Sequence, residues 1–222
     1  MYKLYHYFLC PSSRFIRLVL EENKIAYQTQ LENYWNPQKE FLLLNPAGHL
    51  PVLIDTDNYP LIGANVCMEY LNNLNFKLNL MNGCYKQDAE IRRIFHWFEY
   101  VFKKEVLDPL LYEKVFTRVI KNINPNSNNI RSALQNLSFH KDYINYLLKN
   151  NDWIVGGNFT YADVIASANF SVLDYLGLLD FGKSIYIKEW YVKIKSRPSF
   201  KVLLNDDIVG IPPDNNYKTI DL

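Results

Sequence analysis

The chain divides into two parts that differ in the spacing of their hydrophobic residues. Up to about residue 75, short apolar runs of strand length alternate with segments whose apolar residues recur at helical spacing. This alternation predicts the order β-α-β-α-β-β-α, which is the pattern of a small α/β domain. The predicted strands are residues 3–7, 25–31, 51–54 and 59–62, and the predicted helices are residues 12–23, 37–44 and 63–75.

Strand patterns stop after about residue 86, and the remaining periodicity predicts helices. One long helical segment runs from residue 87 to about 120, with Pro109 as an expected kink, and a polar loop follows at 122–129. A later segment is apolar nearly throughout, which is typical of a central helix. The further predicted helices are 130–148, 161–176 and 184–195. The predicted division of the chain is an α/β domain at 1–75, a linker at 76–86, a helical domain at 87–200 and a tail at 201–222.

Composition excludes several classes of protein. The 24 basic and 23 acidic residues leave a net charge of +1, which argues against a nucleic-acid binder that relies on bulk charge. No apolar run approaches the ~18 residues of a membrane helix, and charges and Pro11 interrupt the first residues too soon for a signal peptide. We therefore expect a cytoplasmic protein without membrane insertion. Its three cysteines are too few for a disulfide scaffold, and its scattered Cys and His residues lack metal-ligand spacing, so no metal site is expected.

Cys10 is the first candidate for chemistry. It lies between a predicted strand and a predicted helix, in the sequence Cys-Pro-Ser-Ser at residues 10–13. The amides at a helix N-terminus would stabilise a thiolate there and lower its pKa, so Cys10 could attack disulfides or electrophiles. A small buried residue at the end of a strand is the structural alternative.

The segment from Asn45 to Leu53 contains a second candidate. A loop that ends in Leu50-Pro51 before a strand suits a cis proline, which would present the Leu50 backbone to a peptide-like ligand. The alternative is an ordinary turn.

A third motif begins the predicted helix at 161–176. Thr160 precedes this helix and Asp163 lies three residues later, a variant of the capping box. We interpret both as structural residues that cap the helix.

Together these segments resemble the glutathione transferase superfamily over nearly the whole chain. The matching segments are LYHYFLCPSSRFIRLVLEE, FLLLNPAGHLPVL, GANVCMEYL and FTYADVIASANFSVLDYLG. The resemblance implies a thioredoxin-like N-terminal domain, an all-helical C-terminal domain and a homodimer. It also implies that Cys10 holds the position of the catalytic Ser, Cys or Tyr, and that Leu50, before a cis Pro51, holds the position that binds the glutathione backbone.

One departure from the superfamily pattern weakens the expected glutathione site. The superfamily has Glu-Ser at the start of the third helix, where this chain has Gly63-Ala64. Each lost hydrogen bond to a charged ligand is worth ~1.5–3 kcal/mol, so affinity should fall by one to several orders of magnitude. Asn65 could compensate in part through its amide. Glutathione is therefore expected to bind weakly and not to be required.

A narrower resemblance involves the FtsZ-localised, glutathione-transferase-like division proteins of alphaproteobacteria. It covers ENYWNPQKEFLLLNPAG, DWIVGGNFTYADVIASANFSVLDYLG, WYVKIKSRPSF and the tail GIPPDNNYKTIDL. This resemblance implies binding to FtsZ, recruitment to the division site and a working surface outside the cleft. Trp35 in a predicted loop is a candidate contact because indoles are frequent at binding hot spots, with packing at a dimer or domain interface as the alternative. The candidates in the tail, which could instead pack within the molecule, are Tyr217, Ile220, Asp221 and Leu222.

Two functional hypotheses follow from these resemblances. The first is a dimeric, non-enzymatic adaptor that binds FtsZ filaments in cell division. The second is a glutathione transferase or thiol transferase that uses Cys10 to activate or bond glutathione. A third function, a stress-response partner of RNA polymerase, also occurs on this fold and is supported by analogy alone.

Overall fold

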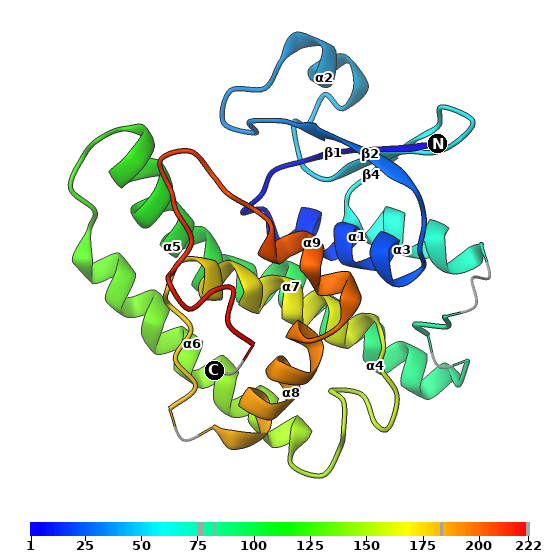
Figure 1. Cartoon of the computed structure of the whole chain (residues 1–222), viewed down its shortest axis with the longest axis vertical. Helices are drawn as coiled ribbons and strands as arrows, with labels where there is room; N and C mark the ends of the chain where they lie inside the picture. Colours follow the sequence, from blue (N-terminus) through cyan, green and yellow to red (C-terminus); the bar gives the residue numbers. More distant parts are fainter. Residues whose placement is uncertain (75–77, 82, 183, 221–222) are drawn as a thin grey trace.

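The computed structural model of the chain describes residues 1–74, 78–81, 83–182 and 184–220 (Figure 1). Its N-terminal half contains a four-stranded mixed sheet in the order β2-β1-β3-β4. Strand β1 pairs in parallel with β2 and antiparallel with β3, which in turn pairs antiparallel with β4. The strands are β1 (Tyr2–His6), β2 (Tyr27–Leu31), β3 (Val52–Ile54) and β4 (Pro60–Ile62).

Three helices complete this half in the predicted order. They are α1 (Pro11–Glu22), α2 (Lys39–Leu44) and α3 (Ala64–Asn73). Helices α1 and α3 lie between the sheet and the rest of the molecule, whereas α2 lies on the other side of the sheet (Figure 1). Helix α1 is buried along ten consecutive residues because it packs against α3 and against the helical half of the molecule.

Among the residues that the structure describes, the named elements of the second half are all helices. A continuous helical stretch, α4 (Tyr85–His96), η1 (Trp97–Leu107), α5 (Asp108–Leu111) and η2 (Tyr112–Ile120), passes through Pro109. Segments η1 and η2 have wide π-helical turns, an uncommon form found where the regular hydrogen-bond ladder is disturbed. The later elements are α6 (Ser127–Leu148), α7 (Tyr161–Tyr175), α8 (Ile185–Lys195), η3 (Pro198–Phe200) and α9 (Lys201–Leu204).

Helix α7 occupies the centre of the helical half, as its apolar sequence predicts. All fifteen of its residues are buried, and it packs directly against α1 (Figure 1). The predicted fold class, a thioredoxin-like domain followed by a helical domain, is therefore confirmed. Among the described residues, no helix is both long and apolar enough to span a membrane.

One predicted loop is partly wrong. Residues 127–129 were expected in the polar loop at 122–129, but they form the first turn of α6. The reason is Asn126, whose side chain accepts hydrogen bonds from the backbone N–H groups of Asn128 and Asn129. An asparagine in this position stabilises a helix start that periodicity alone does not reveal.

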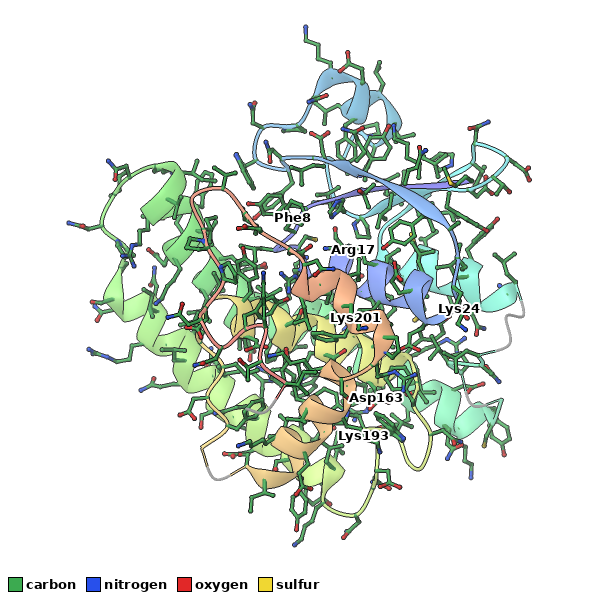
Figure 2. The ribbon with its side chains drawn as sticks, in the orientation of Figure 1. Phe8, Arg17, Lys24, Asp163, Lys193 and Lys201 are labelled. Atoms are coloured by element: carbon green, nitrogen blue, oxygen red, sulfur yellow. The ribbon has the colours of Figure 1, made fainter. Side chains whose placement is uncertain are left out.

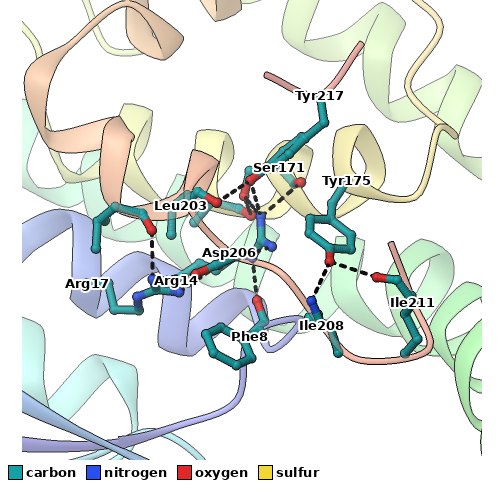
Figure 3. Close-up of polar contacts among 12 residues, drawn as sticks. Phe8, Arg14, Arg17, Ser171, Tyr175, Leu203, Asp206, Ile208, Ile211 and Tyr217 are labelled. Atoms are coloured by element: carbon teal, nitrogen blue, oxygen red, sulfur yellow. Dashed lines mark hydrogen bonds and ion pairs between the residues drawn. The ribbon is translucent and has the colours of Figure 1, made fainter. Parts of the chain in front are cut away.

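The C-terminal segment is fastened to α1 by two buried arginines. Asp206 accepts two hydrogen bonds from Arg17, at 2.7 and 2.8 Å, and lies 3.5 Å from Arg14. Arg14 donates to the Tyr217 hydroxyl at 3.0 Å (Figure 3). The Arg17 guanidinium also lies over the Phe8 ring, 5.8 Å from its centroid (Figure 2). These contacts join residues 206–217 to the N-terminal half.

Candidate functional site

Cys10 lies where the sequence predicts, at the N-cap of α1. Strand β1 ends at His6, and a short turn then brings the Cys10 N–H within 3.1 Å of the Tyr7 carbonyl. Pro11 follows at the first helical position, where its missing N–H has no cost. The Cys10 carbonyl accepts the first hydrogen bond of the helix, from Arg14.

The expected low pKa of Cys10 is wrong. Burial raises the pKa of this thiol above its usual range, and the opposing effect of the nearby Lys103 ammonium does not cancel it. The helix N-terminus favours a thiolate, but the low polarity of the surroundings outweighs that effect. Cys10 is therefore a neutral thiol near pH 7.

Charged side chains from the helical half face Cys10. Ser12, at the start of α1, donates to both carboxylate oxygens of Glu99, with distances of 2.7 and 2.9 Å. Burial raises the pKa of Glu99 despite the nearby Lys103, which itself interacts with Cys10, Glu99 and Asp108. This group of charges was not predicted, because Glu99 is 87 residues from Ser12 in the sequence.

The predicted cis peptide bond is present between Leu50 and Pro51. The Pro51 carbonyl accepts a hydrogen bond from the Gly63 N–H at 2.9 Å, so the proline loop lies beside the start of α3. Gly63 has a φ of +89°, a conformation that favours glycine. The residues of the expected glutathione site thus lie together in this part of the structure.

The start of α3 offers few groups to a ligand. Gly63 has no side chain, and the Ala64 methyl group is only 3% exposed. Asn65 is exposed, so its amide is the side-chain polar group that these three positions present to solvent. The carboxylate and hydroxyl that are typical of this position in glutathione transferases are both absent from residues 63 and 64.

Trp35 is half-buried. Its ring packs edge-on against Tyr7 at 4.8 Å and against Tyr34 at 5.0 Å. Burial and the neighbouring Cys10 raise the pKa of Tyr34 to about 12. Trp35 therefore belongs to an aromatic group next to Cys10 rather than to a free loop.

The tail prediction needs a correction at Tyr217. This side chain is fully buried, and its hydroxyl donates to the Leu203 carbonyl while it accepts from Arg14 (Figure 3). A residue in this position cannot contact a partner, so a partner-binding role for Tyr217 is wrong. Ile220 is 42% exposed, whereas Asp221 and Leu222 lie outside the described residues.

Thr160 and Asp163 lie at the start of α7, within the core. Asp163 accepts hydrogen bonds from the Thr160 N–H and hydroxyl and from the indole of Trp190. Burial raises the pKa of Asp163 to about 6. These contacts give both residues a structural role at the start of α7.

The remaining thiols are separate from this site. Cys67 is buried in α3 and donates to the Leu61 carbonyl, and Cys84 is exposed before α4. In the part of the chain that the structure describes, no three His, Cys, Asp or Glu residues are grouped as metal ligands.

The fold, with Cys10 at the N-cap of α1 and a cis peptide bond before Pro51, defines a protein of the glutathione S-transferase type. The family model for the glutathione S-transferase N-terminal domain matches residues 9–74. A glutathione S-transferase structure from Rhodospirillum rubrum is 36% identical, covers 100% of both chains and superposes with a TM-score of 0.95.

A more specific relationship comes from one relative that matches almost the whole chain. FtsZ-localized protein A of Caulobacter vibrioides is 34% identical over 98% of this chain and 97% of that protein. The structure of FzlA from C. crescentus is 33% identical, covers 100% of this chain and 99% of that chain, and has a TM-score of 0.97. The chain belongs to the FtsZ-localized protein A family of glutathione S-transferase-like proteins.

Proposed function

We propose that this chain is an adaptor on a glutathione S-transferase fold that binds FtsZ during cell division. The observation that carries the proposal is the end-to-end similarity to a protein named for its localisation with FtsZ, at 34% identity over 98% of the chain. Because the match includes both halves and the tail, it extends beyond the fold that all glutathione transferases share.

The chemistry around Cys10 supports an adaptor rather than a transferase. A glutathione γ-glutamyl group would find no side-chain acceptor at Gly63 and no hydroxyl at Ala64, whose methyl group lies in the core. Two lost hydrogen bonds of ~1.5–3 kcal/mol each weaken the affinity for glutathione by one to several orders of magnitude. Burial also keeps Cys10 protonated. We propose that the glutathione site is reduced and that glutathione is not required.

The proposed adaptor is a homodimer that is recruited to the division site. The two chains of such a dimer could each bind one FtsZ filament and so bridge neighbouring filaments. Trp35 and Ile220 remain candidate contacts with FtsZ. Trp35 offers part of an indole surface beside Tyr34, and Ile220 is 42% exposed. Light scattering of the purified chain gives its mass in solution, and a monomer at micromolar concentration would contradict the dimer.

Co-sedimentation tests the adaptor function. The purified chain is centrifuged with FtsZ from the same organism in the presence of GTP, and in a matched sample with GDP. We expect the chain in the pellet only when FtsZ polymerises. If the chain stays in the supernatant with GTP at micromolar concentration, it is not an FtsZ-binding protein.

A second candidate function is a glutathione-dependent transferase. The observation that favours it is the position of Cys10 at the N-cap of α1, with Lys103 close enough to lower its pKa in part. This function predicts retention on glutathione-agarose and thiol transferase activity that Cys10→Ala abolishes. Absence of both properties would exclude it.

A further inference from the structure

Residues 208–211 form a tight turn whose tip is exposed. The Ile211 N–H donates to the Ile208 carbonyl at 2.9 Å, and Gly210 has a φ of +81°. A positive φ at the third residue is typical of a type II turn, in which glycine is preferred. The two isoleucines at the base are each 9% exposed, whereas Val209 at the tip is 100% exposed.

Buried groups hold this turn in place. The Tyr175 hydroxyl accepts a hydrogen bond from the Ile208 N–H at 3.1 Å and donates to the Ile211 carbonyl at 2.7 Å (Figure 3). Tyr175 belongs to α7 and is fully buried. Val209 is therefore presented at a fixed place, and its own side chain adds nothing to the packing of the turn.

The turn lies beside the end of η2 (Figure 1). That end of η2 carries further exposed apolar side chains. A methyl group on Gly210 would lie 3.7 Å from Cγ1 of Val119. We give the name 209 patch to the exposed apolar side chains of the turn, of the end of η2 and of the loop that follows η2. Its members and exposed fractions are Val119 (39%), Ile120 (41%), Ile123 (58%) and Val209 (100%).

The charges around the 209 patch are mainly basic. Arg118 and Lys121 are exposed on the same end of η2, and the Lys121 ammonium lies 4.8 Å from the centroid of the Phe116 ring. Two acidic residues lie in the same segments. Glu113 is buried and accepts a hydrogen bond from the Asn126 N–H, just before α6, whereas Asp207 is exposed and directly precedes the turn. An apolar centre with a basic edge complements a segment that carries apolar and acidic side chains.

We propose that the 209 patch is the docking surface for FtsZ, through an FtsZ segment that combines apolar and acidic residues. This inference rests on the proposed function and assigns it a place on the molecule. The patch is preformed, so binding does not have to order the turn, which lowers the entropic cost of association.

Two kinds of variant test the patch in the GTP-dependent co-sedimentation assay, with the bound fraction measured over a range of chain concentrations. Val209→Asp places a charge in the apolar centre, and Arg118→Glu combined with Lys121→Glu reverses the basic edge. We expect each to weaken binding about tenfold or more, and added NaCl to weaken binding of the unmodified chain. All three positions are exposed, so circular dichroism and thermal melting should be unchanged.

Matched controls carry the same changes elsewhere. Leu43→Asp alters an apolar side chain that is 86% exposed on α2, and Lys39→Glu with Lys188→Glu makes the same change in net charge. These controls should bind like the unmodified chain. If the unmodified chain pellets and the patch variants bind equally well, the 209 patch is not the docking surface and the adaptor function stands. If the unmodified chain does not pellet, the adaptor function itself fails, and the inference fails with it.

Discussion

Replacing Asp206 by asparagine removes the counter-charge of two buried arginines while it keeps the shape of the side chain. Asp206 accepts two hydrogen bonds from Arg17 and lies 3.5 Å from Arg14. The side chains of all three residues are at most 5% exposed, so water cannot replace the lost carboxylate. Breaking a buried ion pair from one side typically costs 3–5 kcal/mol, so we expect a loss of about 4 kcal/mol.

This loss is a large fraction of the free energy of unfolding of an ordinary domain, which is roughly 5–15 kcal/mol. Urea unfolding followed by tryptophan fluorescence and circular dichroism measures it directly. The midpoint should fall with little change in slope, and a thermal melt should shift downward by roughly 6–20 °C.

The chain offers an exposed ion pair as a control. Arg92 lies 2.9 Å from Glu69, with side chains that are 46% and 39% exposed. Glu69→Gln should therefore cost less than about 1 kcal/mol, because solvent screens the pair. If Asp206→Asn were no more destabilising than Glu69→Gln, the buried arginines would not hold the C-terminal segment, and the reasoning would be refuted.

Three further predictions concern titration, capping and reactivity. Burial, with Arg17 and Arg14, lowers the pKa of His6 to about 3, so the folded chain keeps His6 neutral. Below about pH 6.5 the unfolded chain binds a proton at His6 that the folded chain does not bind. The free energy of unfolding is therefore unaffected by His6 titration above about pH 6.5 and falls by about 1.4 kcal/mol per pH unit from there down to about pH 3. Urea unfolding at several pH values should show a smaller loss in His6→Gln, and an equal loss would contradict this pKa. Thr160→Ala should cost about 1 kcal/mol in the same urea assay, and an unchanged midpoint would argue against the cap. In a Cys84→Ser chain, alkylation of Cys10 by iodoacetamide should be slow near pH 7 and still be increasing with pH at about pH 9, because burial raises the pKa of this thiol. A plateau near pH 6 would instead indicate a thiolate.

Local patterns predicted most of the fold. Helix α7 and strands β3 and β4 follow from apolar spacing and from turn residues that act over short distances. The start of α6 was missed because one asparagine side chain, Asn126, decides it. Such a cap has no periodicity, and only its residue type could have suggested it.

The candidate site was predicted less completely because its chemistry depends on distant contacts. The position of Cys10 follows from the strand and helix on either side, but its pKa depends on burial that both halves create. The pairing of Ser12 with Glu99 spans 87 residues, and the burial of Tyr217 depends on Arg14, 203 residues away. One sequence contains no information on which distant residues meet, so these contacts required the structure.

The ion pair between Arg17 and Asp206 also determines when the N-terminal half can become fully stable during synthesis. The carboxylate that neutralises this arginine follows 189 residues later in the chain. At about 5–20 residues per second, the ribosome delivers it roughly 10–40 s after α1. During that interval the N-terminal half holds two arginines without their counter-ion, so it cannot reach its final stability while the chain is still growing. Completion of the first half must wait until Asp206 has left the ribosome.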